Sequence, residues 1–138
     1  MKIVLKNGAF MPTRAHPDDA GLDLYSPINY YLIHGSSCLI DTGVSVQIPK
    51  GYYGKLESKS GLMAKNDVVT AGGVIDSGYT GTIKVPMHNY SPSTDYWIRR
   101  GDKITQMVII PIVTPELELV ESLEDTERGE KGFGSSGK

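Results

Sequence analysis

Apolar and polar residues alternate over short stretches of this 138-residue chain. Val44, Val46 and Ile48 would fall on one face of an extended segment, with polar residues on the other face. Such alternation is typical of a strand with one buried face. Further β-rich runs, separated by turn signals, are CLIDTGVSVQI, DVVTAGGVI, GTIKVPMHNY and KITQMVIIPIV. The pattern predicts an all-β fold, which could be a sandwich, a barrel or a jelly roll.

The rest of the pattern predicts one short helix and a change of character near the C-terminus. The helix is expected to have one or two turns around Gly61 to Lys65. The acidic stretch PELELVESLEDTERGE carries apolar residues that predict a last strand, namely Leu117, Leu119 and Val120. We therefore expect one β domain over residues 1–123, followed by a flexible, Gly/Ser-rich C-terminal arm over residues 124–138.

The stretch RGEKGFGSSGK contains the spacing G-x-x-x-x-G-K, which is part of the phosphate-binding loop of nucleotide hydrolases. A working loop of that kind also needs a strand before it, a Ser or Thr after its Lys, and a helix behind it. We therefore do not expect a P-loop here, although glycine-rich backbone can still wrap an anion. Phe133, between two glycines, favours a segment that closes over a planar ligand and not a tail that only confers solubility.

Composition and charge narrow the range of partners. The formal net charge of −2 gives no sign of a nucleic-acid-binding surface, so phosphates would be bound by a few placed cations. The single cysteine, Cys38, is expected to be a small buried side chain, and His16, His34 and His88 lack the spacing of zinc ligands. No apolar run reaches the roughly 18 residues needed to span a bilayer. We expect an intracellular, cytoplasmic protein without a membrane partner, and a nuclear or viral origin stays open.

Polar groups gather in five stretches between the expected strands. Asp23 should point away from Leu22 and Leu24, because successive side chains of a strand alternate. Lys59 and Ser60 offer a cation and a hydroxyl that suit phosphate. Each stretch alone is more typical of a solvated turn, but their joint presence indicates a binding site on a rigid scaffold.

In order along the chain, AGLDLYS, SKSGL, GGVIDSGYTG, RRGDKITQMVI and RGEKGFGSSG resemble the five motifs of the trimeric deoxyuridine triphosphate nucleotidohydrolases (dUTPases). The resemblance runs from about Ala20 to Gly137. It implies a jelly-roll-like β-barrel, a homotrimer whose three active sites are each built from all three chains, and Mg²⁺ as cofactor. The implied reaction is hydrolysis of dUTP to dUMP and pyrophosphate, which limits uracil incorporation into DNA and supplies dUMP for thymidylate synthesis.

The resemblance also implies roles for individual residues. Asp76 would be the general base that activates the attacking water, and the apolar pair before it would partly desolvate its carboxylate. Asp23 would hold Mg²⁺ through water ligands, with the ion chelated mainly by the triphosphate. The backbone of the hairpin from Thr70 to Val74 would read the uracil edge, and Tyr79 would pack beneath the deoxyribose. The implied substrate-binding set is Lys59, Ser60, Gly61, Thr70, Gly73, Val74, Tyr79, Gln106, Arg128, Phe133, Gly134 and Ser135. Within this set, Arg128 would reach the γ-phosphate and Phe133 would cover the base.

The chain departs from the family pattern in two places, and two rival functions remain. The second motif has Lys59 where Arg is usual, which puts a bidentate phosphate grip in doubt. The third motif reads SGYTG, so Thr80 stands where Arg is common. The related dCTP deaminases need a catalytic Glu after the second motif, which we do not find, and lack the Phe-bearing arm. A non-catalytic, nucleotide-sensing regulatory protein would use the same pocket.

Overall fold

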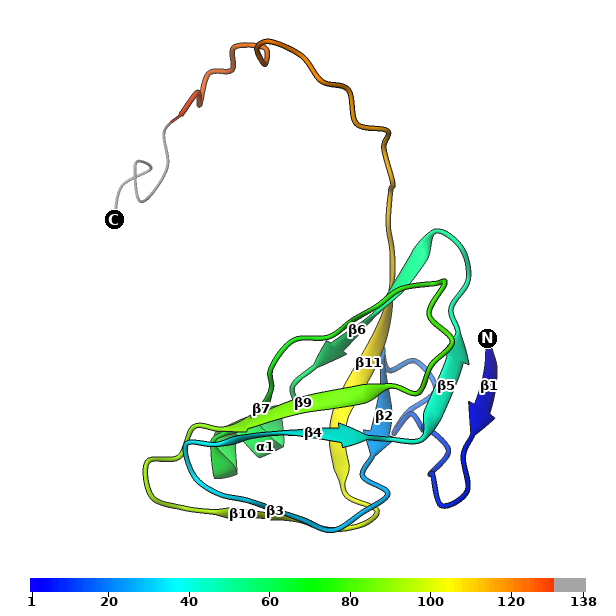
Figure 1. Cartoon of the computed structure of the whole chain (residues 1–138), viewed down its shortest axis with the longest axis vertical. Helices are drawn as coiled ribbons and strands as arrows, with labels where there is room; N and C mark the ends of the chain where they lie inside the picture. Colours follow the sequence, from blue (N-terminus) through cyan, green and yellow to red (C-terminus); the bar gives the residue numbers. More distant parts are fainter. Residues whose placement is uncertain (131–138) are drawn as a thin grey trace.

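The computed structural model describes residues 1–130, which form short β-strands and one helix (Figure 1). The prediction of a nearly all-β fold with one short helix is confirmed. In chain order the elements are β1 Lys2–Leu5, β2 Gly21–Tyr25, β3 Tyr30–Leu32, β4 Ser37–Asp41, β5 Val44–Gln47, β6 Tyr52–Glu57, α1 Ser60–Asn66, β7 Val68–Thr70, β8 Val74–Ile75, β9 Lys84–Asn89, β10 Tyr96–Ile98 and β11 Lys103–Pro111.

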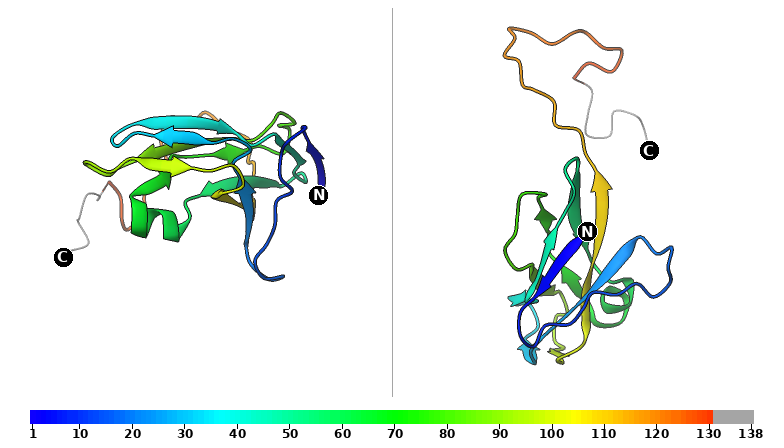
Figure 2. Two further views of the ribbon diagram at one scale, coloured as in Figure 1. Left: turned by 90° about the horizontal axis from the view of Figure 1, so that it is seen from below. Right: turned by 90° about the vertical axis from the view of Figure 1, so that its right-hand side faces the viewer.

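The strands of the described residues pair antiparallel in four separate sheets. The largest sheet has the order β2-β11-β6-β8, and a second sheet has the order β4-β9-β7. Two ribbons, β1-β5 and β10-β3, complete the layers seen in Figures 1 and 2. The sheets are not joined into a closed ring, so the predicted barrel closure is not found within the single chain.

The hydrophobic core lies between these sheets and follows the alternation of the sequence. Val44 and Val46 of β5 are buried, whereas Gln47, the last residue of the strand, is exposed. Burying an aliphatic side chain of this size contributes about 1.5–3 kcal/mol. The fully buried apolar side chains come from all the sheets and include Leu24, Leu32, Ile40, Val68, Ile83, Val85, Met87, Ile98, Ile104 and Met107.

Helix α1 is short and lies at the periphery of the strands (Figures 1 and 2). It follows Lys59, whose extended backbone (φ −81°, ψ 122°) marks the N-cap. It ends at Asn66. The C-cap residue Asp67 takes a left-handed conformation (φ 55°) and donates its backbone N–H to the carbonyl of Met63 at 3.1 Å. No residue of α1 is fully buried, and Leu62 is its partly buried contact with the core.

The segment after β11 contradicts one prediction. No strand forms within residues 112–130, and Leu117 and Leu119 are 98% and 99% exposed. In Figure 1 and the right-hand view of Figure 2 this segment runs away from the sheets. The predicted strand is wrong for the single chain because an extended segment without a neighbour leaves its backbone groups unpaired.

Among the described residues, no helix is long and apolar enough to cross a membrane.

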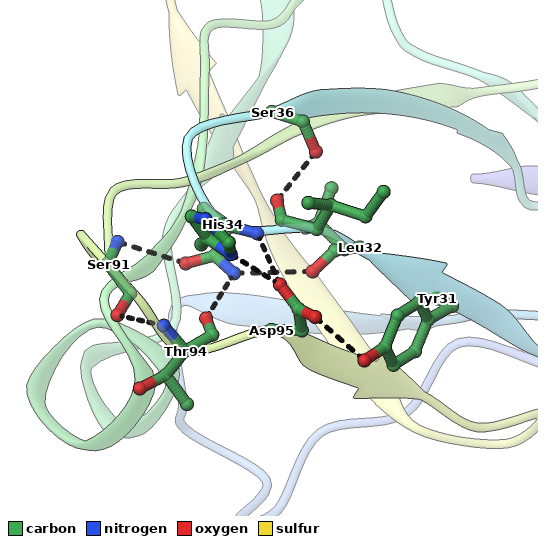
Figure 3. Close-up of polar contacts among 9 residues, drawn as sticks. Tyr31, Leu32, His34, Ser36, Ser91, Thr94 and Asp95 are labelled. Atoms are coloured by element: carbon green, nitrogen blue, oxygen red, sulfur yellow. Dashed lines mark hydrogen bonds and ion pairs between the residues drawn. The ribbon is translucent and has the colours of Figure 1, made fainter.

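Two polar side chains fix the loops around β3 and β10 (Figure 3). Buried Asn89 donates from Nδ2 to the carbonyls of Leu32 and Thr94, at 3.3 and 2.9 Å. Asp95 accepts hydrogen bonds from the Tyr31 hydroxyl at 2.7 Å and from the backbone N–H of His34 at 2.8 Å. These contacts tie the β3–β4 turn to the β9–β10 connection.

Candidate active site

Asp23 is the buried acidic residue at the centre of the candidate site. Its backbone is held on both sides, by pairing with Gln106 of β11 and by two hydrogen bonds with Thr13. Its side chain is 8% exposed and is turned away from the core, into which Leu24 of the same strand points. The position of this carboxylate is therefore set by the sheet and not by a mobile loop.

Two lysines hold the carboxylate of Asp23. Lys59 Nζ lies 2.5 Å from Oδ1 and Lys103 Nζ lies 2.7 Å from Oδ2. Burial raises the pKa of Asp23, but the hydrogen bonds and charges of Lys103 and Lys59 outweigh it and lower the pKa below its ordinary value. The hydrogen bond to Asp23 also raises the pKa of Lys103. Asp23 is therefore a carboxylate at neutral pH, and the three groups together carry a net positive charge.

Gln106 lies beside Asp23 in the same row of the sheet. Its Nε2 donates to the backbone carbonyl of Ser58 at 3.4 Å. The side chain occupies the space next to Gly21, where a Cβ would lie 2.2 Å from Gln106 Oε1. Glycine at position 21 therefore makes room for the side chain of Gln106.

The hairpin around Thr70 is tied to the end of β6. Ser58 Oγ accepts from the Thr70 N–H at 2.9 Å and donates to the Thr70 carbonyl at 3.3 Å. The Thr70 hydroxyl donates to the Thr105 hydroxyl at 3.0 Å. Gly73 has a φ of 137°, and a Cβ there would lie 2.6 Å from Leu56 Cβ. This tight turn therefore requires glycine at position 73.

Asp76 and Tyr79 belong to one turn after β8. The Tyr79 N–H donates to the Asp76 carbonyl at 3.0 Å, and the Tyr79 hydroxyl donates to the Thr82 carbonyl at 2.9 Å. The ring of Tyr79 lies against Gly81, where a Cβ would be 2.6 Å from its hydroxyl oxygen. Asp76 is exposed, and Val74 before it is 66% exposed. The expected desolvation of Asp76 is therefore absent in the single chain, because β8 is an edge strand.

The single chain does not bring Asp76 next to Asp23. Asp76 follows Ile75, whose row in the sheet contains Ile109, whereas the row of Asp23 contains Gln106. Three residues along β11 correspond to roughly 10 Å, and the three strand spacings from β2 to β8 correspond to roughly 14 Å. The structure thus gathers Asp23, Lys59 and Gln106 at one place and leaves Asp76 at another.

The remaining predicted residues lie outside both groups or outside the described part of the chain. Ser60 and Gly61 form the exposed start of α1. Arg128 is exposed and belongs to the segment that leaves the sheets. Three predicted residues lie outside the described residues, namely Phe133, Gly134 and Ser135.

Lys103 is the residue that the sequence-based set missed. It stands in the stretch RRGDKITQ, where an ordinary turn is the simplest interpretation. Only the pairing of Lys103 with Tyr25, two residues after Asp23, brings its side chain to the carboxylate. The signal in the sequence was therefore limited to its position at the start of an expected strand.

The described residues suit a cation that is held only partly by the protein. No group of three or more His, Cys, Asp or Glu side chains gathers within residues 1–130, so an all-protein metal cage is absent there. Mg²⁺ prefers oxygen ligands, keeps several waters, and is often bound by one carboxylate together with substrate phosphates. The single carboxylate of Asp23 fits that mode. Cys38 was expected to be buried but is only half-buried, and this burial raises the pKa of its thiol.

Comparison with known proteins identifies the same family that the five sequence motifs resemble. The family model for dUTPase matches residues 7–137. The deoxyuridine 5'-triphosphate nucleotidohydrolase of Rhodococcus erythropolis is 45% identical over 92% of this chain and 79% of its own length. A probable enzyme of the same name from Schizosaccharomyces pombe is 41% identical over 96% of this chain and 94% of its own length.

Solved structures of dUTPases also superimpose on this chain. A mutant Staphylococcus bacteriophage 80alpha dUTPase with dUpNHpp superimposes with a TM-score of 0.92, at 36% identity, covering 99% of this chain and 98% of that chain. A mutant dUTPase from phage phi11 of S. aureus, described with a structural Mg(II) ion, gives a TM-score of 0.84 at 34% identity, covering 90% of this chain and 98% of that chain. The chain therefore belongs to the dUTPase family, the Mg²⁺-dependent dUTP diphosphatases that hydrolyse dUTP.

Proposed function

We propose that this chain hydrolyses dUTP to dUMP and pyrophosphate by attack of water on the α-phosphorus. The observation that supports it most directly is the buried Asp23 carboxylate between Lys59 and Lys103. One negative and two positive charges leave a net positive centre, which suits an anionic triphosphate. The reaction would limit uracil incorporation into DNA and supply dUMP, in keeping with a cytoplasmic location beside the nucleotide pool.

Each residue of the predicted site would have its own role in the reaction. The carboxylate of Asp76 would take a proton from water as the water oxygen bonds to the α-phosphorus and the bond to the bridging oxygen of the pyrophosphate breaks. Lys59, Ser60 and Gln106 would orient phosphate oxygens, and the cations would stabilise the developing charge. Asp23 would hold Mg²⁺ through water ligands, and the ion, when bound, supplies charge neutralisation on the phosphates.

A homotrimer with shared active sites explains two features of the single chain. Asp76 and Asp23 lie apart in the sheet, so a complete site would take Asp76 and Tyr79 from one chain and Asp23, Lys59 and Gln106 from another. Val113, Leu117, Leu119 and Leu123 are 87–99% exposed, and exposed apolar residues in such a run are typical of a segment that is covered by a partner. Residues 124–138, with Arg128 and Phe133, would then close over a nucleotide.

The test is pyrophosphate release with Mg²⁺ and a panel of dUTP, UTP, dCTP and dTTP, together with the molar mass by light scattering. We expect turnover of dUTP only and a mass about three times 15.0 kDa. Ammonia release from dCTP would instead indicate a deaminase, and dUTP binding without turnover would indicate a sensor. A monomeric mass with full activity would contradict the shared active site.

A further inference from the structure

We propose that the two lysines on Asp23 have different roles: Lys103 is a positioning residue that fixes the carboxylate through Oδ2, whereas Lys59 is an exchangeable partner that leaves Oδ1 for the phosphates when the Mg²⁺–nucleotide complex binds. The inference rests on the proposed function, because it concerns how this chain receives that complex. It adds Lys103 to the residues on which the site depends.

Lys103 is placed by the backbone of the sheet. Lys103 pairs with Tyr25 and Gln106 pairs with Asp23, and the register shifts between Lys103 and Thr105. In a regular strand, residues 103 and 106 would point to opposite faces. The extra residue of the bulge puts both side chains on the face of Asp23. The neighbouring carbonyl of Asp102 accepts the N–H of Ser26 at 2.9 Å, which holds the start of β11 in place.

Lys59, in contrast, is placed by a connection outside the sheet, where its carbonyl accepts the N–H groups of Leu62 and Met63 at 3.0 and 3.1 Å. It lies in the connection between β6 and α1, in extended backbone, and no side-chain hydrogen bond caps the helix there. Its side chain is less exposed than that of Lys103, 26% against 41%, but no strand pairing anchors the backbone that carries it. Its three donors stand on a flexible four-carbon stem. The ammonium group can therefore turn from Asp23 to a phosphate oxygen without any movement of the sheet.

The charges explain why both lysines are needed. With Lys103 in place, Asp23 remains partly neutralised after Lys59 departs, so Lys59 is held less tightly than it would be by an isolated buried carboxylate. Without Lys103, Asp23 would rely on Lys59 alone. The carboxylate would then both hold Lys59 more strongly and lose its fixed orientation toward the cation.

Isothermal titration with a non-hydrolysable dUTP analogue, with and without Mg²⁺, tests the role of Lys103. The ratio of the two dissociation constants measures the coupling between Mg²⁺ and nucleotide. Lys103→Met should lower this ratio about fivefold or more, and Lys103→Arg should keep most of it. Lys6→Met is the matched control, because Lys6 forms a separate ion pair with Asp41 at 3.8 Å. The control should leave the ratio unchanged.

A double-mutant cycle separates positioning from general charge. In an Asp23→Asn background, Lys103→Met should have no further effect on the ratio, because Lys103 acts through Asp23. The contrary outcomes are that Lys103→Met weakens analogue binding equally with and without Mg²⁺, or lowers the ratio just as much in the Asp23→Asn background as in the wild type. Each of these results would show that Lys103 acts only as a distant charge. Either result overturns the positioning role. Thermal unfolding checks each variant, and Lys103→Gln replaces Lys103→Met if the latter does not fold.

Binding without Mg²⁺ tests the exchange of Lys59. Asp23→Asn should bind the analogue more tightly than the wild type, because Lys59 is no longer held on Oδ1. The same substitution in a Lys59→Met background should give no gain, and a gain that persists there would overturn the exchange. If the wild type turns over dUTP but Lys103→Met leaves the coupling between Mg²⁺ and nucleotide unchanged, the positioning role of Lys103 is overturned and the proposed function stands. Absence of both turnover and analogue binding in the wild type overturns the proposed function as well.

Discussion

Asp95 accepts two hydrogen bonds from His34, one from the backbone N–H at 2.8 Å and one from the ring Nδ1 at 2.7 Å (Figure 3). The backbone N–H of His34, the Tyr31 hydroxyl and the His34 ring lower the pKa of Asp95 from 3.8 to about 2. A carboxyl group whose pKa is lower in the folded state stabilises the fold above its unfolded pKa. That stability is lost as the pH falls from about 4 to about 2.

Asp95→Asn should therefore remove part of the acid dependence of stability. We expect the melting temperatures of wild type and variant to differ most above pH 4 and to converge toward pH 2. Thermal unfolding followed by circular dichroism across this range measures the effect. Exposed Asp18, changed to Asn, serves as the control, and a difference that stays constant with pH would contradict the role of the Asp95 carboxylate.

Features of the fold that depend on one stretch of sequence could be predicted, whereas features that depend on pairing between strands could not. The alternation around Val44 and Val46 fixes a strand and its buried face, because side-chain direction follows from the backbone alone. The run around Leu117 has a similar apolar character but forms no strand in the single chain, because a strand also needs a neighbour. Closure of the sheets is likewise a matter of pairing, which the pattern of single strands does not contain.

The residues of the candidate site also divide into those marked by a local motif and those brought together only by strand pairing. Asp23, Lys59 and Gln106 were predicted from motifs, and the structure places them together. Lys103 was missed because its approach to Asp23 depends on a bulge in β11, a feature of register that leaves little trace in composition. The separation of Asp76 from Asp23 depends on the order of four strands, which motif order along the chain does not reveal.

Asp76→Asn should abolish hydrolysis while a non-hydrolysable dUTP analogue still binds. The amide keeps the shape of the side chain but cannot take a proton, and loss of a general base typically costs roughly 10²- to 10⁴-fold in rate. Single-turnover kinetics and titration calorimetry measure the two effects. Turnover above about a tenth of the wild-type rate would assign the base elsewhere, since it falls well short of that loss.

Tyr79→Ala should narrow the preference for dUTP over UTP, because the ring beneath the sugar would no longer exclude a 2′-hydroxyl. Tyr79→Phe is the matched control, since it loses only the hydrogen bond to the Thr82 carbonyl and keeps the ring against Gly81. The ratio of kcat/KM for the two nucleotides is the measurement. An unchanged ratio in Tyr79→Ala would assign sugar discrimination to another residue.

Deletion of residues 129–138, or Phe133→Ala, should leave the thermal transition nearly unchanged and strongly depress turnover, because closure over the nucleotide excludes water. Phe133→Trp provides a direct reporter of closure. Trp97 is the one native tryptophan and is about half exposed, so the reporter is best placed in a Trp97→Phe background. A fluorescence signal that does not change at saturating analogue would count against a closing arm.

Lys59→Met should lower kcat/KM at least about tenfold, equivalent to about 1.4 kcal/mol of transition-state stabilisation. The substitution keeps the length of the side chain but removes the charge that would reach the phosphates from its place on Asp23 Oδ1. Arg at this position should be tolerated, with a modest loss from its longer, planar group or a gain if it grips phosphate with two hydrogen bonds.

The alternative for Lys59 is a long-range attraction that leaves phosphate binding to Ser60 and backbone groups. Lys59→Met would then change kcat/KM by less than about twofold, and the small difference would shrink further with added salt because exposed charges are screened. Steady-state kinetics at low and high salt, with Lys6→Met as the control for loss of one cation, separates the two cases. Near-wild-type activity of Lys59→Met would remove this residue from the site, whereas a large, salt-insensitive loss would show that its ammonium group contacts the substrate.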